Sequence, residues 1–110
     1  MARKLVSIVK EKMIEYYAGD SRRVHHFLKV HSFAKLIAEI ENMDPGEQEV
    51  LEIAALTHDI GIKNAELKYG YNNGRLQEQE GPPEARRLLR DAGADERAVE
   101  RACYLVAHHH

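Results

Sequence analysis

The segment from Val50 to Leu56 carries apolar residues around nearly the whole circumference of a helix, which predicts a central helix buried on most sides. Its start is well marked. Asp44 can accept hydrogen bonds from the first turn, Pro45 suits the first helical position, and Glu47 completes a pattern like a capping box. The helix is expected to end within the run 57–61. A chain with such a helix has to surround it with other elements.

Apolar residues recur at helical intervals in four further segments, and no alternating pattern typical of strands competes with them. Helices are expected over residues 2–18 and 20–42. Pro82 and Pro83 are expected to start another, and the segment 92–95 breaks it and caps a last helix. The predicted apolar face of the second helix consists of Phe27, Val30, Phe33, Ala34, Ile37 and Ile40. The sequence therefore predicts an all-α fold, a compact bundle of five or six helices.

Residues 62–81 are poor in apolar periodicity. They contain Gly70, Asn72, Asn73, Gly74 and Gly81, and such residues favour turns. We expect a long loop here, in which residues 69–80 are more mobile than the helices. A loop of this length is uncommon in a small domain and is often functional. The sequence leaves open whether it closes over a ligand.

The composition is that of one ordinary globular domain over residues 1–110, with 44% hydrophobic residues, 31% charged residues and a formal net charge of −2. Nucleic-acid partners are not expected, because proteins that bind them usually carry a clear basic excess. Charged residues soon interrupt Val6, Ile8 and Val9, so neither export nor a membrane span is expected. The single cysteine, Cys103, agrees with a reducing cytoplasm, which is the expected location.

His58 and Asp59 stand at the end of the most apolar helix, where polar side chains are costly unless they are paired or hold a metal ion. The second predicted helix contains His25, His26 and His31, and one of these three could offer a further ligand while the others are surface or core residues. Two histidines and an aspartate from different helices are the beginning of a metal site. The alternative is structural. A histidine is favoured at a helix C-terminus by the helix dipole, and an aspartate is common in a turn.

The pattern His26-x-x-x-Val30, followed 32 residues after His26 by His58-Asp59-Ile60-Gly61, resembles the HD superfamily of metal-dependent phosphohydrolases. The resemblance runs from about Ser21 to the end of the chain. It implies an all-α domain in which His26, His58 and Asp59 hold a divalent metal ion. Asp59 could also orient or deprotonate the attacking water. The family's last ligand is an Asp in a helix beyond the one that ends near His110, where the sequence stops. The expectation is that the protein either continues past His110 or lacks the family's final helix and this ligand.

Some relatives bind a second metal ion through extra histidines, and this implies further candidates here. His108 and His109 stand where the family often has histidines at a helix end, although a purification tag is the alternative, above all for His110. Glu80 occupies a position where such relatives often carry a histidine. It could bind a metal ion, a bridging water or a substrate group, and Glu78 could assist it. The alternative for Glu80 is an acidic residue that interacts with a helix dipole.

Lys63 and Arg75 are the basic residues nearest to the predicted site in the sequence, and one or the other is expected to bind the substrate and neutralise charge on its phosphate. A lysine shortly after the His-Asp pair often contacts phosphate in the family, but Ile62 displaces Lys63 by one position. A solvated lysine is the alternative.

The resulting hypothesis is hydrolysis of a phosphate ester or phosphoanhydride in a nucleotide-like small molecule. The mixed imidazole and carboxylate ligands suit Mn, Fe, Ni, Co or Zn better than Mg. The alternatives are a non-catalytic module that binds metal or nucleotide and a structural bundle with incidental histidines. The sequence is also compatible with a homo-oligomer.

Overall fold

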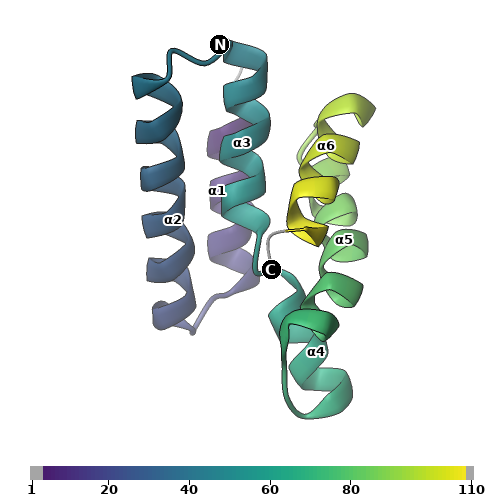
Figure 1. The fold of residues 1–110 in the computed structure, drawn as a ribbon. Helices are drawn as coiled ribbons and strands as arrows, with labels where there is room; N and C mark the ends of the chain where they lie inside the picture. The colour runs from purple at the N-terminus through teal and green to yellow at the C-terminus, as the bar shows by residue number, and fades with distance from the viewer. Residues whose placement is uncertain (1–3, 109–110) are drawn as a thin grey trace.

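The computed structural model describes residues 4–108 and contains, over that range, six helices and no strand (Figure 1). The helices are α1 (Leu5–Tyr16), α2 (Ser21–Ile40), α3 (Pro45–Thr57), α4 (Gly61–Tyr69), α5 (Gly74–Asp91) and α6 (Glu96–Ala107). The prediction of an all-α bundle of five or six helices is confirmed. In the described range, no helix is both long enough and apolar enough to cross a membrane.

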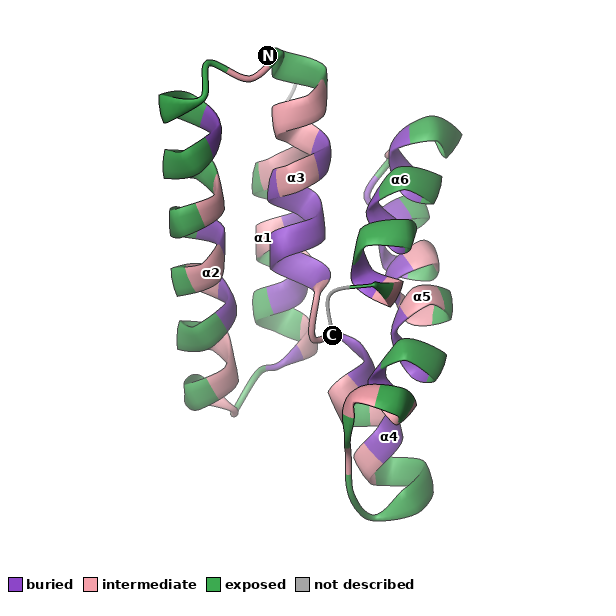
Figure 2. Ribbon diagram, viewed as in Figure 1, coloured by how far each residue is buried: buried purple, intermediate pink, exposed green. Residues whose placement is uncertain are grey.

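The helices form two groups that meet at α3 (Figure 1). α1 and α2 pack against α3 on one side, α6 packs against it on the other, and α5 joins α6 to α4. α3 is therefore the central helix, as predicted, and it is buried from Glu52 to Thr57 (Figure 2). α2 lies at an edge of the bundle, because it packs mainly against α3 and only slightly against α1.

Short polar side chains fix the starts of four helices. Asp20, Asp44 and Asp95 each accept a hydrogen bond from a backbone N–H in the first turn of α2, α3 and α6. The caps at Asp44 and within residues 92–95 were expected from the sequence. Asn73 caps α5 in the same way. Each cap satisfies donors that a helix leaves unpaired and contributes about 1 kcal/mol.

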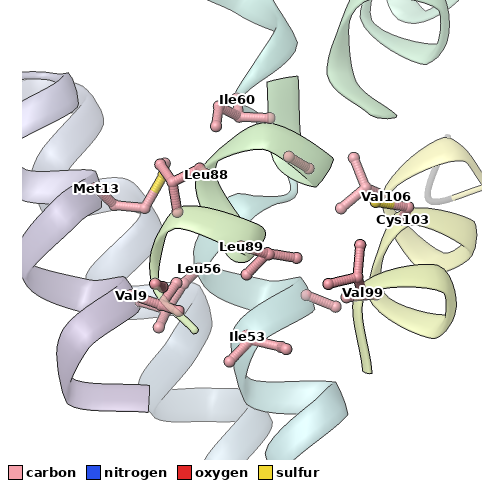
Figure 3. Packing of buried hydrophobic residues seen from close by; sticks show 14 of the residues in the cluster. Val9, Met13, Ile53, Leu56, Ile60, Leu88, Leu89, Val99, Cys103 and Val106 are labelled. Carbon is pink, nitrogen blue, oxygen red and sulfur yellow. The ribbon is translucent and has the colours of Figure 1, made fainter. Parts of the chain in front are cut away.

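The core is built from aliphatic side chains of α1, α3, α5 and α6, which converge between the two groups of helices (Figure 3). Its largest fully buried members include Met13, Ile53, Leu56, Leu89 and Val99. Burying one such side chain contributes roughly 1.5–3 kcal/mol, so this cluster dominates the stability of the bundle.

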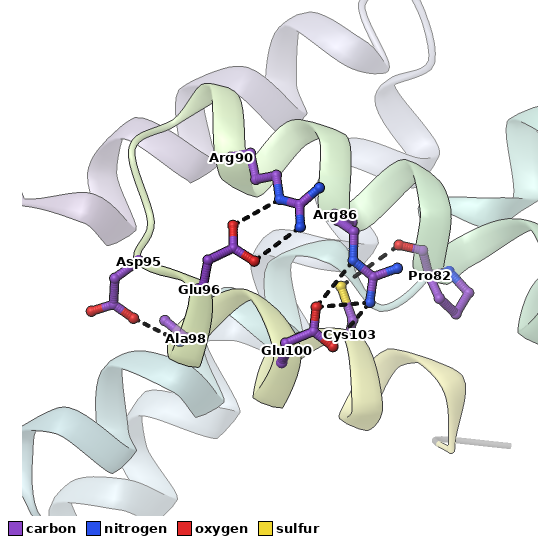
Figure 4. Close-up of polar contacts among 8 residues, drawn as sticks. All are labelled: Pro82, Arg86, Arg90, Asp95, Glu96, Ala98, Glu100 and Cys103. Atoms are coloured by element: carbon purple, nitrogen blue, oxygen red, sulfur yellow. Dashed lines mark hydrogen bonds and ion pairs between the residues drawn. The ribbon is translucent and has the colours of Figure 1, made fainter.

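On the outside, ion pairs join α5 to α6 (Figure 4). Arg86 contacts Glu100 at 3.0 Å and Arg90 contacts Glu96 at 2.9 Å. Close to them, the buried thiol of Cys103 lies 3.6 Å from the carbonyl oxygen of Pro82. Exposed ion pairs are each worth little. The two ion pairs orient α5 and α6 relative to each other, and the apolar contact between these helices supplies most of the stability of their packing.

The predicted loop over residues 62–81 is wrong, because only residues 70–73 separate α4 from α5. Pro82 and Pro83 do not start a helix but lie inside α5. The two helices meet through small residues rather than an apolar stripe. A Cβ atom added to Gly61 would lie 2.7 Å from the nitrogen of Gly81. Such a contact leaves no apolar periodicity in the sequence.

The predicted apolar face of α2 is wrong in its second half. Phe27 is buried as expected, but Phe33, Ile37 and Ile40 are exposed. In addition to Phe27, α2 buries His31 and Ala38. The buried residues lie at one edge of the predicted face, and its members Phe33, Ile37 and Ile40 are each more than half exposed.

Candidate metal centre

His26 from α2 meets His58 and Asp59, which follow directly after α3. One ligand atom from each of the three lies within 4.8 Å of the other two. The Oδ2 atom of Asp59 is 3.2 Å from Nε2 of His26 and 3.1 Å from Nε2 of His58. Ligands bonded at about 2.0–2.1 Å to one ion lie roughly 3–3.5 Å apart, so these spacings fit a divalent transition metal. The side chain of His26 is 55% exposed, whereas those of His58 and Asp59 are 15% and 20% exposed, so the centre opens on the α2 side.

The ring of His58 is oriented by the last turn of α3. Its Nδ1 atom lies 2.7 Å from the carbonyl oxygen of Ala55, which can only accept a hydrogen bond. The proton of the neutral ring therefore belongs on Nδ1, and Nε2 is left with a lone pair directed at the centre. Metal-binding histidines are commonly fixed in this way by a second hydrogen bond.

The protonation of His58 reflects opposing influences. Burial lowers its pKa, but the hydrogen bond and the charge of Asp59, with a contribution from Ala55, outweigh this and raise the pKa above the ordinary value of 6.5. An anionic partner stabilises a cation placed on that ring. The same surroundings suit a positive ion held between His58 and Asp59.

The backbone of Asp59 is held in place by Tyr17, the residue that follows α1. The Tyr17 hydroxyl donates to the backbone carbonyl oxygen of Asp59 at 2.9 Å. Burial raises the pKa of Tyr17, so the hydroxyl keeps its proton at any ordinary pH. Sequence analysis did not identify Tyr17 as part of the site, because its partner is a backbone atom and leaves no mark in the residue pattern.

Comparison with known proteins agrees with this geometry. The family model of the HD domain matches residues 23–110, which include His26, His58 and Asp59. The chain belongs to the HD domain family. The predicted resemblance is thereby confirmed. Searches of curated proteins and of solved structures gave no match.

Two basic residues of this HD domain were predicted to contact phosphate. The ammonium group of Lys63 donates to the backbone oxygen of Tyr16 at 3.1 Å and lies 4.7 Å from the centre of its ring. Arg75 is exposed in the first turn of α5. Arg23 is a further basic residue, three positions before His26 on α2. Its guanidinium contacts Asp20 at 2.9 Å and Glu66 at 3.1 Å. The roles of Lys63 and Arg75 remain predictions.

Glu80 is buried in α5 and pairs with Lys68 of α4, with 2.7 Å between oxygen and nitrogen. It does not belong to the group of His26, His58 and Asp59, and Glu78 is exposed. The structure thus gives Glu80 a partner between two helices. Its predicted catalytic role stays a prediction, and in that role its carboxylate would have to leave Lys68.

His108 closes α6. Its ring stacks on Tyr104, with 4.2 Å between the centroids, and Nδ1 lies 2.7 Å from the Tyr104 carbonyl oxygen. An apolar groove between α2, α3 and α6 has His108 and His58 in its lining. His109 and His110 lie outside the described residues. Metal binding by His108 and His109 stays a prediction.

Proposed function

We propose that this HD domain is a metal-dependent phosphohydrolase that acts on a phosphate ester or phosphoanhydride of a small, nucleotide-like molecule. The observation that supports this most strongly is the convergence of His26, His58 and Asp59 from two helices onto one point. Three ligands at a partly open position are what a catalytic ion needs, because substrate or water must reach it. Membership of the HD family supports the same reaction class.

A divalent ion bound here would lower the pKa of a water and polarise a phosphoryl oxygen. The protein's own residues have separate tasks. His26 and His58 would each hold the ion through a ring nitrogen, and Asp59 would supply the negative charge. Asp59 would also orient the attacking water or accept its proton. Tyr17 and the Ala55 carbonyl hold these groups in place and so reduce the reorganisation needed during the reaction.

The negative charge of the phosphate would be neutralised by basic side chains of the helices around the centre. Lys63 is the predicted candidate, and it would have to exchange its contact with the Tyr16 oxygen for a phosphate oxygen. Arg23 is an alternative, because it lies one helical turn from His26 and its guanidinium can form paired hydrogen bonds with phosphate. Arg75 would require the start of α5 to approach the centre.

The test is hydrolysis of nucleoside phosphates and of an aryl phosphate by the full-length protein, loaded in turn with Mn²⁺, Co²⁺, Zn²⁺ and Mg²⁺. We expect metal-dependent turnover that Asp59→Asn abolishes while the helix content, measured by circular dichroism, stays unchanged. Lys63→Ala should reduce the rate less. Asp91→Asn, on an exposed position of α5, is the matched control and should leave the rate unchanged.

A non-catalytic module that binds metal or nucleotide is the second candidate. It is favoured by one observation: Lys63 and Arg23 are both already engaged, with Tyr16 and with Asp20 and Glu66 respectively. If the metal-loaded protein binds nucleotide tightly and hydrolyses none of the substrates, this candidate replaces the hydrolase.

A further inference from the structure

The side of α2 that faces away from α3 is exposed to solvent (Figure 2), and it carries an apolar stripe. The stripe consists of Phe33, Leu36, Ile37 and Ile40, and these side chains are 51–71% exposed. Their spacing of three and four residues places them within an arc of about 100° on the helix. Soluble monomers rarely expose a contiguous apolar patch of this kind, and such patches mark interaction sites.

The stripe is distinct from the apolar groove beside the metal centre. The groove is lined from α2 by Val30 and Ala34, and none of the four stripe residues contributes to it. Because α2 is an edge helix, the stripe is also reachable by a large partner without displacing any of the other five described helices.

The charges at the two ends of the stripe indicate which partner fits. Lys29 precedes Phe33 by one turn on the same face, and Glu41 follows Ile40 directly; both side chains are exposed. One end of the stripe is therefore cationic and the other anionic. A second copy of α2 packed antiparallel would bring Lys29 of each chain near Glu41 of the other, whereas parallel packing would bring like charges together.

We propose that this HD domain forms a two-fold symmetric dimer through antiparallel packing of α2 on α2. The apolar residues are self-complementary in that arrangement. With the two-fold axis between Leu36 and Ile37, Phe33 of one chain faces Ile40 of the other chain. Leu36 and Ile37 of both chains meet at the axis. A contact of this kind is isologous and closed, as in most soluble homo-oligomers.

The dimer would leave both metal centres accessible. His26 lies ten to eleven residues from the axis, which corresponds to about 16 Å along α2. In this register the partner's α2 ends opposite residue 32 or 33, so it stops before His26. The inference therefore does not depend on the proposed reaction, and it can fail or succeed independently of it.

Sedimentation of the chain of residues 1–110 over a range of concentrations tests the proposal. We expect a species of twice the 12.6 kDa of one chain. The double variant Leu36→Lys/Ile40→Lys should sediment as a monomer with unchanged helix content. Leu67→Lys, which changes a 76% exposed leucine of α4, is the matched control and should remain a dimer. A monomeric wild-type protein, a dimeric α2 variant or a monomeric α4 variant would each overturn the proposal.

Charge reversal and cross-linking test the register. Lys29→Glu should weaken the dimer by placing like charges together, and Lys29→Glu/Glu41→Lys should restore it. A disulfide needs Cα atoms within about 7 Å of each other, so Ile37→Cys should cross-link to itself. Phe33→Cys should cross-link only when mixed with Ile40→Cys. Background is low because Cys103 is buried. Efficient self-cross-linking of Phe33→Cys, or no rescue by the charge swap, would contradict the antiparallel arrangement.

Discussion

Asp59 is the residue on which the metal centre depends, because both histidines approach the same oxygen atom of its side chain. The carboxylate supplies charge, and the backbone of the same residue is anchored by Tyr17. His58 is held separately through Ala55. Residue types and spacing were sufficient to predict His26, His58 and Asp59. The supporting contacts could not be predicted, since both end on backbone oxygen atoms that any sequence provides.

Tyr17→Phe should weaken the centre without removing it. The change deletes one hydrogen bond to a part-buried carbonyl oxygen, so we expect a loss of about 1 kcal/mol in unfolding free energy. Metal affinity should fall by roughly tenfold, as for other supporting contacts of metal sites. Urea denaturation and calorimetric metal titration measure the two effects. Tyr104→Phe, at an exposed position of α6, is the control. Equal effects of the two variants would show that Tyr17 does not anchor Asp59.

His31 predicts how stability depends on pH. Its Nε2 atom lies 2.8 Å from the carboxylate of Glu52, and both side chains are buried between α2 and α3. Burial lowers the pKa of His31, with smaller contributions from Lys10 and Lys35, and the hydrogen bond to Glu52 opposes the shift. The unfolded chain therefore binds a proton more readily than the folded one. Stability is retained above the unfolded pKa of about 6.5 and is lost as the pH falls below it.

His31→Gln should reduce this loss, because the amide can still donate to Glu52 but does not titrate. The measurement is the free energy of unfolding in urea at about pH 7.5 and pH 5.5, on either side of the ordinary histidine pKa. The exposed His25 provides the control, and His25→Gln should behave like the wild type. If His31→Gln loses as much stability on acidification as the wild type, another group is responsible.

At the scale of the helices, α3 could be predicted fully and α4 not at all. α3 has an apolar circumference and a marked start, and both signals are local. α4 buries only Gly61 and Ala65, and α5 uses Gln77, Glu80 and Gly81 in its first half. Small and polar residues at a helix contact look like a loop in the sequence. The prediction for the second half of α2 was wrong for the opposite reason. Its apolar residues looked like a buried face in the sequence, but in the structure of residues 4–108 they are exposed to solvent.

The contact between Gly61 and Gly81 gives an element-scale prediction. Gly61→Ala would place a Cβ atom 2.7–2.9 Å from backbone atoms of Gly81 and Gln77, which cannot move without shifting α5. We expect a loss of about 1–3 kcal/mol, typical of overpacking, measured by urea denaturation. Metal affinity should fall too, because Gly61 follows Asp59 by two residues. Gly46→Ala is the control, since its Cβ would meet only the side chain of Asp44, at 3.2 Å. An unchanged stability of Gly61→Ala would show that α4 and α5 are not tightly packed.

For the whole molecule, the bundle explains why a single centre can form from residues 32 positions apart. α2 and α3 are packed side by side, and the end of α3 brings His58 and Asp59 to the His26 turn of α2. The family and the all-α fold followed from the sequence because helical periodicity and the His-Asp pair are local signals. The position of Glu80 beside Lys68 depended on the α4–α5 contact, which no local pattern revealed.

The most direct test of the metal centre is a Co²⁺ titration of the full-length protein and of Asp59→Asn, followed by calorimetry and by the visible absorption of the bound ion. The variant keeps all the terminal histidines, so metal held only by them is the same in both proteins. We predict that the wild type binds one more Co²⁺ per chain than Asp59→Asn. The double variant His58→Gln/Asp59→Asn should bind the same amount of Co²⁺ as Asp59→Asn. Equal stoichiometry and affinity in the wild type and Asp59→Asn would contradict a metal centre at His26, His58 and Asp59.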